Sequence, residues 1–236
     1  MATQLMARRL RLVRPRMADR VRQRAVVEEA PPRADDGGLL SQLVHDLRNS
    51  LGVIAYYAET LPEAGEVERP DLCERLQMNA RRALQVVEEV TLLADLRNGR
   101  AVPDDAEWDG AALLDELVTE IEVIERRSGC VRTDAVDGAR IRGDRAQLAC
   151  ALRGVLREAV RSGNGSVQAR LTDEDGCAVL TLTIPLRVEP ELDIISRFDD
   201  GTFAVELARG VAGLHGGTLS VEQRPGRATL ALALPR

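Results

Sequence analysis

The 236-residue chain contains no lysine, so all 32 of its basic side chains are arginines. This absence excludes a Walker-A lysine and Schiff-base chemistry. Aromatic residues make up only 2% of the chain, and the formal net charge is −6. The sequence therefore offers neither aromatic stacking platforms nor an overall basic surface, and we expect no nucleic-acid partner.

Cysteine is scarce, and long apolar runs are missing. The four cysteines are scattered singly and form no CxxC pair, so we expect no metal site and read them as small core residues in a reducing compartment. No run approaches the roughly 18 apolar residues of a membrane-spanning helix. The sequence thus predicts a cytoplasmic protein with no transmembrane segment. Its 44% hydrophobic and 30% charged residues are typical of a chain that buries a core.

Charge divides the chain into unequal parts. Residues 1–38 hold nine arginines and five acidic residues, whereas the remainder holds 23 arginines and 33 acidic residues. We expect residues 1–38 to be a basic, flexible N-terminal arm and linker. A basic arm that binds an acidic surface or a membrane is the alternative.

Residues 39–98 carry two apolar patterns with alternating spacings of four and three, as in the seam of a helical bundle. Pro62 ends the first helix, and Asp71 is expected to cap the second. The two seams are Leu40, Val44, Leu47, Leu51, Ile54, Ala58 and Leu61, then Leu72, Leu76, Asn79, Ala83, Val86, Val90 and Leu93. A flanking set that includes Val87 and Ala94 makes the second stripe too wide for one partner helix. We therefore expect two hairpins to pair as a dimeric four-helix bundle.

Residues 108–236 alternate between helical and strand patterns. We expect helices at 111–127, 144–161, 191–197 and 203–214, and strands at 131–136, 139–142, 166–171, 177–186, 218–223 and 227–234. Asp175-Gly176 and Pro225-Gly226 mark hairpin turns. This mixture predicts a two-layer α/β sandwich, so the fold class of the whole chain is α + α/β.

Reactive side chains gather on the first helix of the hairpin. His45 follows the seam residue Val44, so it turns about 100° away from the seam toward solvent. Asp46 can hold the proton of one ring nitrogen and leave the other free to attack. Arg48 supplies a fixed positive charge for a phosphoryl group, and Asn49 can hydrogen-bond a water or a phosphoryl oxygen. The alternative is a surface helix that merely carries a histidine.

The segment Leu43–Leu51 resembles the H-box of bacterial sensor histidine kinases, whose pattern is His, acidic, any, basic, Asn or Thr, Pro, Leu. Six of these seven features match, and Ser50 stands where proline is usual. The family's dimerisation and phosphotransfer domain is a four-helix bundle. The resemblance marks His45, Asp46, Arg48 and Asn49 as the catalytic residues.

The region after Trp108 resembles the family's ATP-binding domain. Gly143–Leu148, the two hairpin turns and the Leu-His-Gly-Gly sequence at 214–217 occur in the family's order. The resemblance implies a structural, helix-end role for His215. It also extends the match over about residues 39–236.

This domain departs from the family at its nucleotide-binding positions. Glu158 stands where the family has the Asn that binds the nucleotide's magnesium, and no glycine occurs from Cys177 to Asp200. The family's glycine boxes fall in this region, and only Gly201 remains. Glycine lets backbone amides approach phosphates closely. We therefore expect the shape of the ATP domain without its ATP.

These observations predict a two-component signal transduction protein. We expect a histidine phosphotransferase that relays a phosphoryl group through His45 between receiver domains of response regulators, without ATP-dependent autophosphorylation. Its partners are a second copy of the chain and receiver domains. It needs no cofactor of its own, because magnesium is expected only on the receiver. Two alternatives remain: a non-catalytic pseudokinase module that regulates a kinase or a response regulator, and a divergent but active ATP-dependent histidine kinase.

Overall fold

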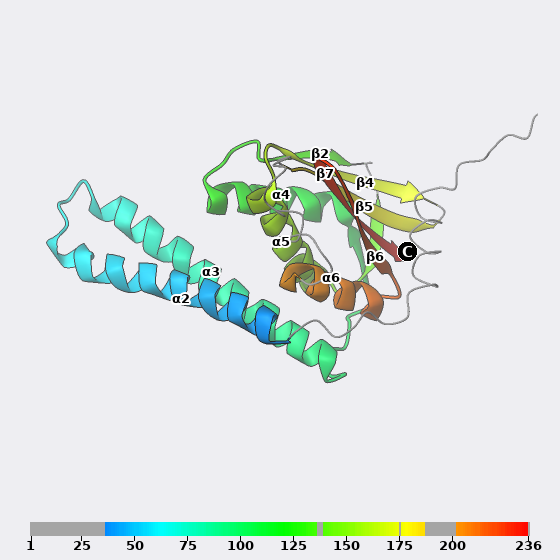
Figure 1. Cartoon of the computed structure of the whole chain (residues 1–236), viewed down its shortest axis with the longest axis horizontal. Helices are drawn as coiled ribbons and strands as arrows, with labels where there is room; N and C mark the ends of the chain where they lie inside the picture. The colour runs from blue at the N-terminus through cyan, green and yellow to red at the C-terminus, as the bar shows by residue number, and fades with distance from the viewer. Residues whose placement is uncertain (1–35, 136–138, 175, 187–201, 236) are drawn as a thin grey trace, which may run out of the picture.

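The computed structural model describes residues 36–135, 139–174, 176–186 and 202–235. A long helical hairpin lies against an α/β unit, and the turn of the hairpin extends beyond that unit (Figure 1). Residues 1–35 of the predicted N-terminal arm and the predicted helix at 191–197 lie outside the described residues. None of the helices within the described ranges is long and apolar enough to cross a membrane.

The hairpin consists of α2 (Asp36–Thr60), the short 3-10 helix η1 (Leu61–Glu63) and α3 (Arg69–Arg97). The prediction that Asp71 caps the second helix is wrong, because α3 begins after Glu68 and has no side-chain cap. Pro70 lies in the first turn, where its missing N–H costs nothing. Asp71 instead accepts a hydrogen bond from Arg75 Nε at 2.7 Å.

The helix α2 has apolar side chains on two sides rather than along one seam. Leu43 and Ser50 are buried, and Leu47 packs against the core of the chain. Val44 and Leu51, which the sequence placed in the same seam, are 47% and 51% exposed. Each follows a buried residue, so its side chain points about 100° around the helix from that buried one. The seam was predicted for a bundle of two hairpins, so its exposure in one chain leaves that prediction untested, and the hairpin keeps an uncovered apolar face.

The second unit contains three helices and seven strands in the described ranges. The helices are α4 (Gly110–Glu125), α5 (Arg145–Ser162) and α6 (Phe203–Leu214). The strands are β1 (Ala106–Asp109), β2 (Val131–Ala135), β3 (Arg140–Gly143), β4 (Val167–Glu174), β5 (Cys177–Pro185), β6 (Thr218–Arg224) and β7 (Arg227–Pro235). Asp109 and Asp144 cap α4 and α5 by accepting backbone N–H bonds from the first turn.

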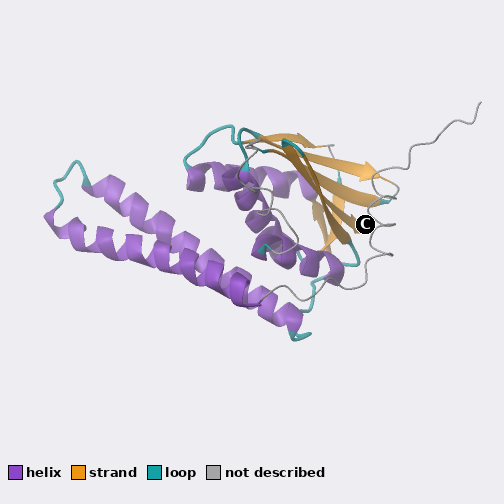
Figure 2. Ribbon diagram, in the orientation of Figure 1, coloured by secondary structure: helices purple, strands orange, loops and turns teal. Residues whose placement is uncertain are grey.

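Five strands form one sheet in the order β2-β4-β5-β7-β6, and β1 pairs with β3 in a small second sheet. Within the large sheet only β2 and β4 are parallel. Figure 2 shows the helices layered on the face of this sheet that is turned toward the hairpin. This arrangement confirms the predicted two-layer sandwich. Strand β1 was not predicted from the sequence. It pairs antiparallel with β3, and Trp108 lies opposite Ile141.

All four cysteines are free thiols. Cys130, Cys150 and Cys177 are buried, as predicted for core residues, whereas Cys73 on α3 is exposed. Burial raises the pKa of the Cys150 thiol to about 12. Because the thiolate is the reactive form, Cys150 is inert at neutral pH.

Candidate functional site

His45 lies on the exposed face of α2, and 71% of its side chain is accessible. Asp46 is the next residue and is less exposed, at 39%. Its Oδ1 lies 3.7 Å from His45 Nδ1, so a small side-chain rotation brings the carboxylate into hydrogen-bond range. The structure therefore places the predicted acceptor and its predicted proton holder side by side in solvent.

Asn49 lies one helical turn after His45. Its Nδ2 is 3.2 Å from His45 Nδ1 and 3.4 Å from Nε2. A neutral imidazole has only one acceptor nitrogen, so the amide can donate to one of these nitrogens at a time. When the Nδ1 proton points to Asp46, Nε2 carries the lone pair, and the Asn49 amide must turn away from Nε2 before this nitrogen can react. Arg48 is exposed on α2, and an added Cβ at Gly52 would meet open space.

The C-terminal unit contacts the hairpin close to this helix. Glu89 of α3 is only 2% exposed, and Arg157 Nη2 of α5 lies 3.0 Å from both of its carboxylate oxygens. Burial raises the pKa of Glu89, and the charge of Arg157 partly opposes that shift. A second contact joins Gln85 Nε2 to Glu120 Oε1 at 2.7 Å. These polar contacts hold α4 and α5 against α3.

This interface between α3 and the helices α4 and α5 was not predicted from the sequence. Glu89 and Arg157 are separated by 68 residues, and nothing in the local pattern of either residue indicates that they pair. The only available signal was the position of Glu89 beside the apolar residues of α3. A charge within such a stripe needs a buried partner.

Glu158 follows Arg157 on α5 and accepts a hydrogen bond from the Ser162 hydroxyl at 2.8 Å. The cavity beside it measures only about 20 Å³. Leu43 of α2, Glu89 of α3 and Phe203 of α6 are among the residues that line it. Residues of the hairpin and Glu158 thus line the same small cavity.

His215 has the structural role that the sequence implied. It follows the last turn of α6, where its Nδ1 lies 2.8 Å from the Val211 carbonyl oxygen. Its Nε2 accepts the backbone N–H of Asp144 at 3.0 Å. Both ring nitrogens are therefore engaged, with the proton on Nδ1. The ring also lies so close to Gly143 that no side chain fits there.

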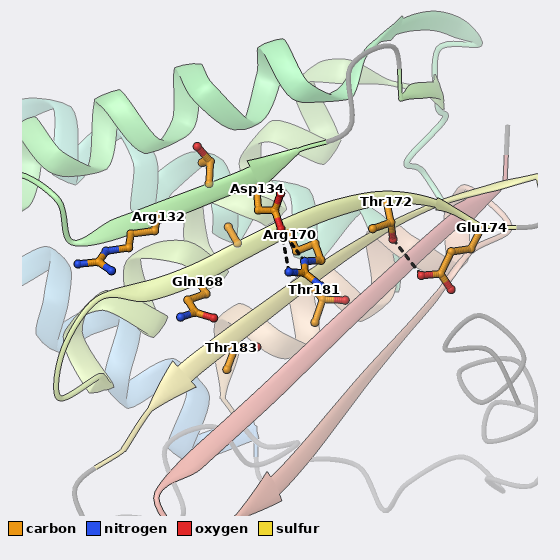
Figure 3. Close-up of a pocket in the computed structure, with 10 residues that line it drawn as sticks. Arg132, Asp134, Gln168, Arg170, Thr172, Glu174, Thr181 and Thr183 are labelled. Atoms are coloured by element: carbon orange, nitrogen blue, oxygen red, sulfur yellow. Dashed lines mark hydrogen bonds and ion pairs between the residues drawn. The ribbon is translucent and has the colours of Figure 1, made fainter. Parts of the chain in front are cut away.

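A hollow with a volume of about 510 Å³ lies on the outer face of the sheet. Figure 3 shows its polar lining on β2, β4 and β5, with Arg170 bonded to Asp134 and Thr172 to Glu174. The ten lining residues include no histidine or cysteine. Throughout the described ranges, no group of three His, Cys, Asp or Glu side chains is placed to hold a metal ion. We therefore take His45 and its neighbours as the candidate site.

Comparisons with known proteins identify relatives of the chain. The model of the His Kinase A (phospho-acceptor) domain matches residues 36–99. The sensor-like histidine kinase SenX3 of Mycobacterium tuberculosis is 27% identical over 218 residues, covering 83% of this chain and 53% of SenX3. SenX3 of Mycobacterium bovis matches equally. The chain thus spans about half the length of these curated relatives.

Two solved structures share the fold. The histidine kinase AdeS of Acinetobacter baumannii aligns with a TM-score of 0.55 at 13% identity, over 81% of this chain and 97% of that one. Full-length ShkA, solved in complex with AMPPNP, aligns with a TM-score of 0.52 at 18% identity, over 83% of this chain and 45% of that one. At these identities the likeness concerns the fold alone.

Proposed function

We propose, from the premise that the chain belongs to the bacterial two-component sensor histidine kinase family, that it relays phosphoryl groups through His45. The donor and the acceptor are receiver domains of response regulators. In this proposal the chain does not phosphorylate itself from ATP. One observation carries it: His45 and Asp46 are accessible on α2, while residues of the hairpin line the same small cavity as Glu158, the position on α5 that would face a nucleotide.

The described residues around Glu158 do not fit a magnesium nucleotide. Pockets for organic ligands measure about 300–1,000 Å³, whereas the space beside Glu158 is about 20 Å³. A carboxylate here also adds negative charge where a triphosphate would lie. The buried Glu89–Arg157 pair holds α3 against this face of α5. We derive no reaction step from ATP for these reasons.

The transfer step needs only side chains of α2 and the receiver's own magnesium. The lone pair of His45 Nε2 attacks the phosphorus of the receiver's aspartyl phosphate. The N–P bond forms as the P–O bond to the aspartate breaks, and the receiver carboxylate leaves with the electron pair. The proton stays on His45 Nδ1, where Asp46 stabilises the cationic ring. Reversal of the same step delivers the phosphoryl group to a second receiver.

Replacing Asp46 by Ala should slow the labelling of His45 by a phosphorylated receiver about 10²-fold or more, as for loss of a general base or its orienting group. Asp46→Asn should retain part of the rate, because its amide oxygen still accepts a hydrogen bond from Nδ1–H. Rapid-quench measurement of the label on the chain provides the rates. Glu59→Ala removes another exposed carboxylate from α2 and should leave the rate unchanged. An unaltered rate in Asp46→Ala would contradict the assignment of Asp46.

The uncovered apolar face of the hairpin supports the proposal that two copies pair. Val44 and Leu51 on α2 and Val87 on α3 are each about half exposed in the single chain. Burying such side chains stabilises an assembly by about 25 cal/mol per Å². A second hairpin would cover them in a four-helix bundle.

Introducing Val44→Glu together with Leu51→Glu should convert the dimer to a monomer, because two buried carboxylates would lack partners. Light scattering coupled to size-exclusion chromatography measures the mass. Val102→Glu is the control, since Val102 is 77% exposed and lies after the end of α3. A double variant that remains dimeric would place the interface elsewhere.

A further inference from the structure

A second cavity lies between the hairpin and the C-terminal unit, and its volume is about 220 Å³. This volume exceeds the roughly 30 Å³ share of one water but is smaller than the pocket of a typical organic ligand. Three helices line it. The lining residues are Asp46, Asn49, Ser50 and Val53 from α2, Asn79, Arg82 and Val86 from α3, and Arg157 and Arg161 from α5.

The three arginines give this cavity donors from two helices. Arg157 also bonds to Glu89, and Arg161 Nε lies 3.2 Å from Glu125 Oε1. A guanidinium has five N–H donors, so a single carboxylate partner leaves others available. Asp46 is the only carboxylate in the lining. The amides of Asn49 and Asn79 and the hydroxyl of the buried Ser50 add neutral hydrogen-bonding groups.

Arg82 lacks some of the partners that its position requires. Its Nη2 donates to the Ile124 carbonyl oxygen at 2.6 Å and lies 3.6 Å from Glu125 Oε1. Its Nε is buried and has no hydrogen-bond partner. Burial lowers the pKa of Arg82. The charge of Glu125 partly opposes this shift, and the positive charges of Arg161 and Arg157 add to it. Such a site gains from a bound negative charge.

We propose that this cavity binds a small tetrahedral oxyanion of the phosphate class, held by Arg82, Arg157 and Arg161. Guanidinium groups match the oxygens of phosphate in paired hydrogen bonds, which favours this ligand over a halide. Because the donors come from both the hairpin and α5, the anion would join the two units. Asn49 both lines the cavity and contacts the His45 ring, so the site adjoins the acceptor. The inference does not depend on the donor or direction of phosphotransfer.

Thermal unfolding of the full chain tests this site, with inorganic phosphate titrated against sodium chloride at matched ionic strength. At ten times the dissociation constant, phosphate should raise the melting temperature by about 3 °C or more over chloride. Arg161→Gln should abolish this difference. Val53→Asp should do the same, because it places a carboxylate on the lining at a position that is 36% exposed and tolerant of change.

Arg81→Gln is the matched control, since Arg81 is exposed on α3 beside Arg82 but does not line the cavity. This variant should retain the full phosphate effect. Phosphate also stabilises proteins by general exclusion from their surface. An equal shift in the parent chain, Arg161→Gln and Val53→Asp would show only that general effect and would overturn the proposal. Isothermal titration calorimetry of the unmodified chain with phosphate must also show saturable heat, and its absence would overturn the proposal independently.

Discussion

The His45→Ala chain should accept no phosphoryl group from any phosphorylated receiver, yet keep the melting temperature of the parent chain. Loss of transfer is expected because His45 supplies the attacking nitrogen. The fold should survive because 71% of the side chain lies in solvent. Radiolabel retained on the chain under alkaline conditions, where phosphohistidine is stable, measures the transfer.

His215→Gln is the control for the second histidine. Both ring nitrogens of His215 are already bonded within the fold, so this variant should lose about 1–3 kcal/mol of unfolding free energy and still be labelled. If His45→Ala retained the label, the acceptor would have to be another residue. If neither the parent chain nor His45→Ala accepted a phosphoryl group, the pseudokinase alternative would replace the relay.

The Arg157→Ala chain should lose about 3–5 kcal/mol of unfolding free energy, as when a buried ion pair loses one partner. Glu89 would then keep a carboxylate in a site that is 2% exposed. Urea denaturation gives the free energy. Arg145→Ala removes an arginine from an exposed pair with Glu116 on the same unit and is the control. A loss in Arg157→Ala no larger than that in Arg145→Ala would mean that the buried pair does not hold the interface.

The loss in Arg157→Ala should depend on pH. Burial raises the pKa of Glu89 above its ordinary value of 4.5, so the folded chain holds this proton more tightly than the unfolded chain. The stability that comes from the tighter proton binding of Glu89 is fully present below its ordinary pKa of 4.5. It disappears as the pH rises through the higher pKa that Glu89 has in the folded chain. The loss of unfolding free energy in Arg157→Ala should therefore become smaller as the pH falls toward the pKa of Glu89. A combined Glu89→Met and Arg157→Met chain should recover most of the stability at neutral pH.

The sequence predicted elements well where local chemistry decides them. The predicted bounds of α6, 203–214, agree with the structure because its apolar period is regular. The β6–β7 hairpin turns at Gly226, which has a φ of 77° that glycine adopts without strain. Strand β1 was missed because its four residues show no clear alternation, and only pairing with β3 defines it.

Only the part of the candidate site that lies on the single helix α2 could be predicted from the sequence. His45, Asp46 and Asn49 lie within one and a half turns of α2, so helical geometry alone brings them together. Which apolar residues of α2 pack within the chain and which stay exposed could not be derived in the same way, because apolar residues lie on two sides of this helix. The Glu89–Arg157 pair and the arginines around the second cavity depend on how two units dock. No local pattern in the sequence predicts how the hairpin and the C-terminal unit pack together.

In the proposed relay, His45 receives its phosphoryl group from a receiver and not from ATP. The most direct measurement incubates the full chain with magnesium and labelled ATP, and separately with each response regulator of the source organism, phosphorylated on its receiver. We expect label on the chain from at least one receiver, none from ATP, and none in either case for His45→Ala. Labelling of His45 by ATP alone, or failure of every receiver to label it, would show that the chain is not such a relay.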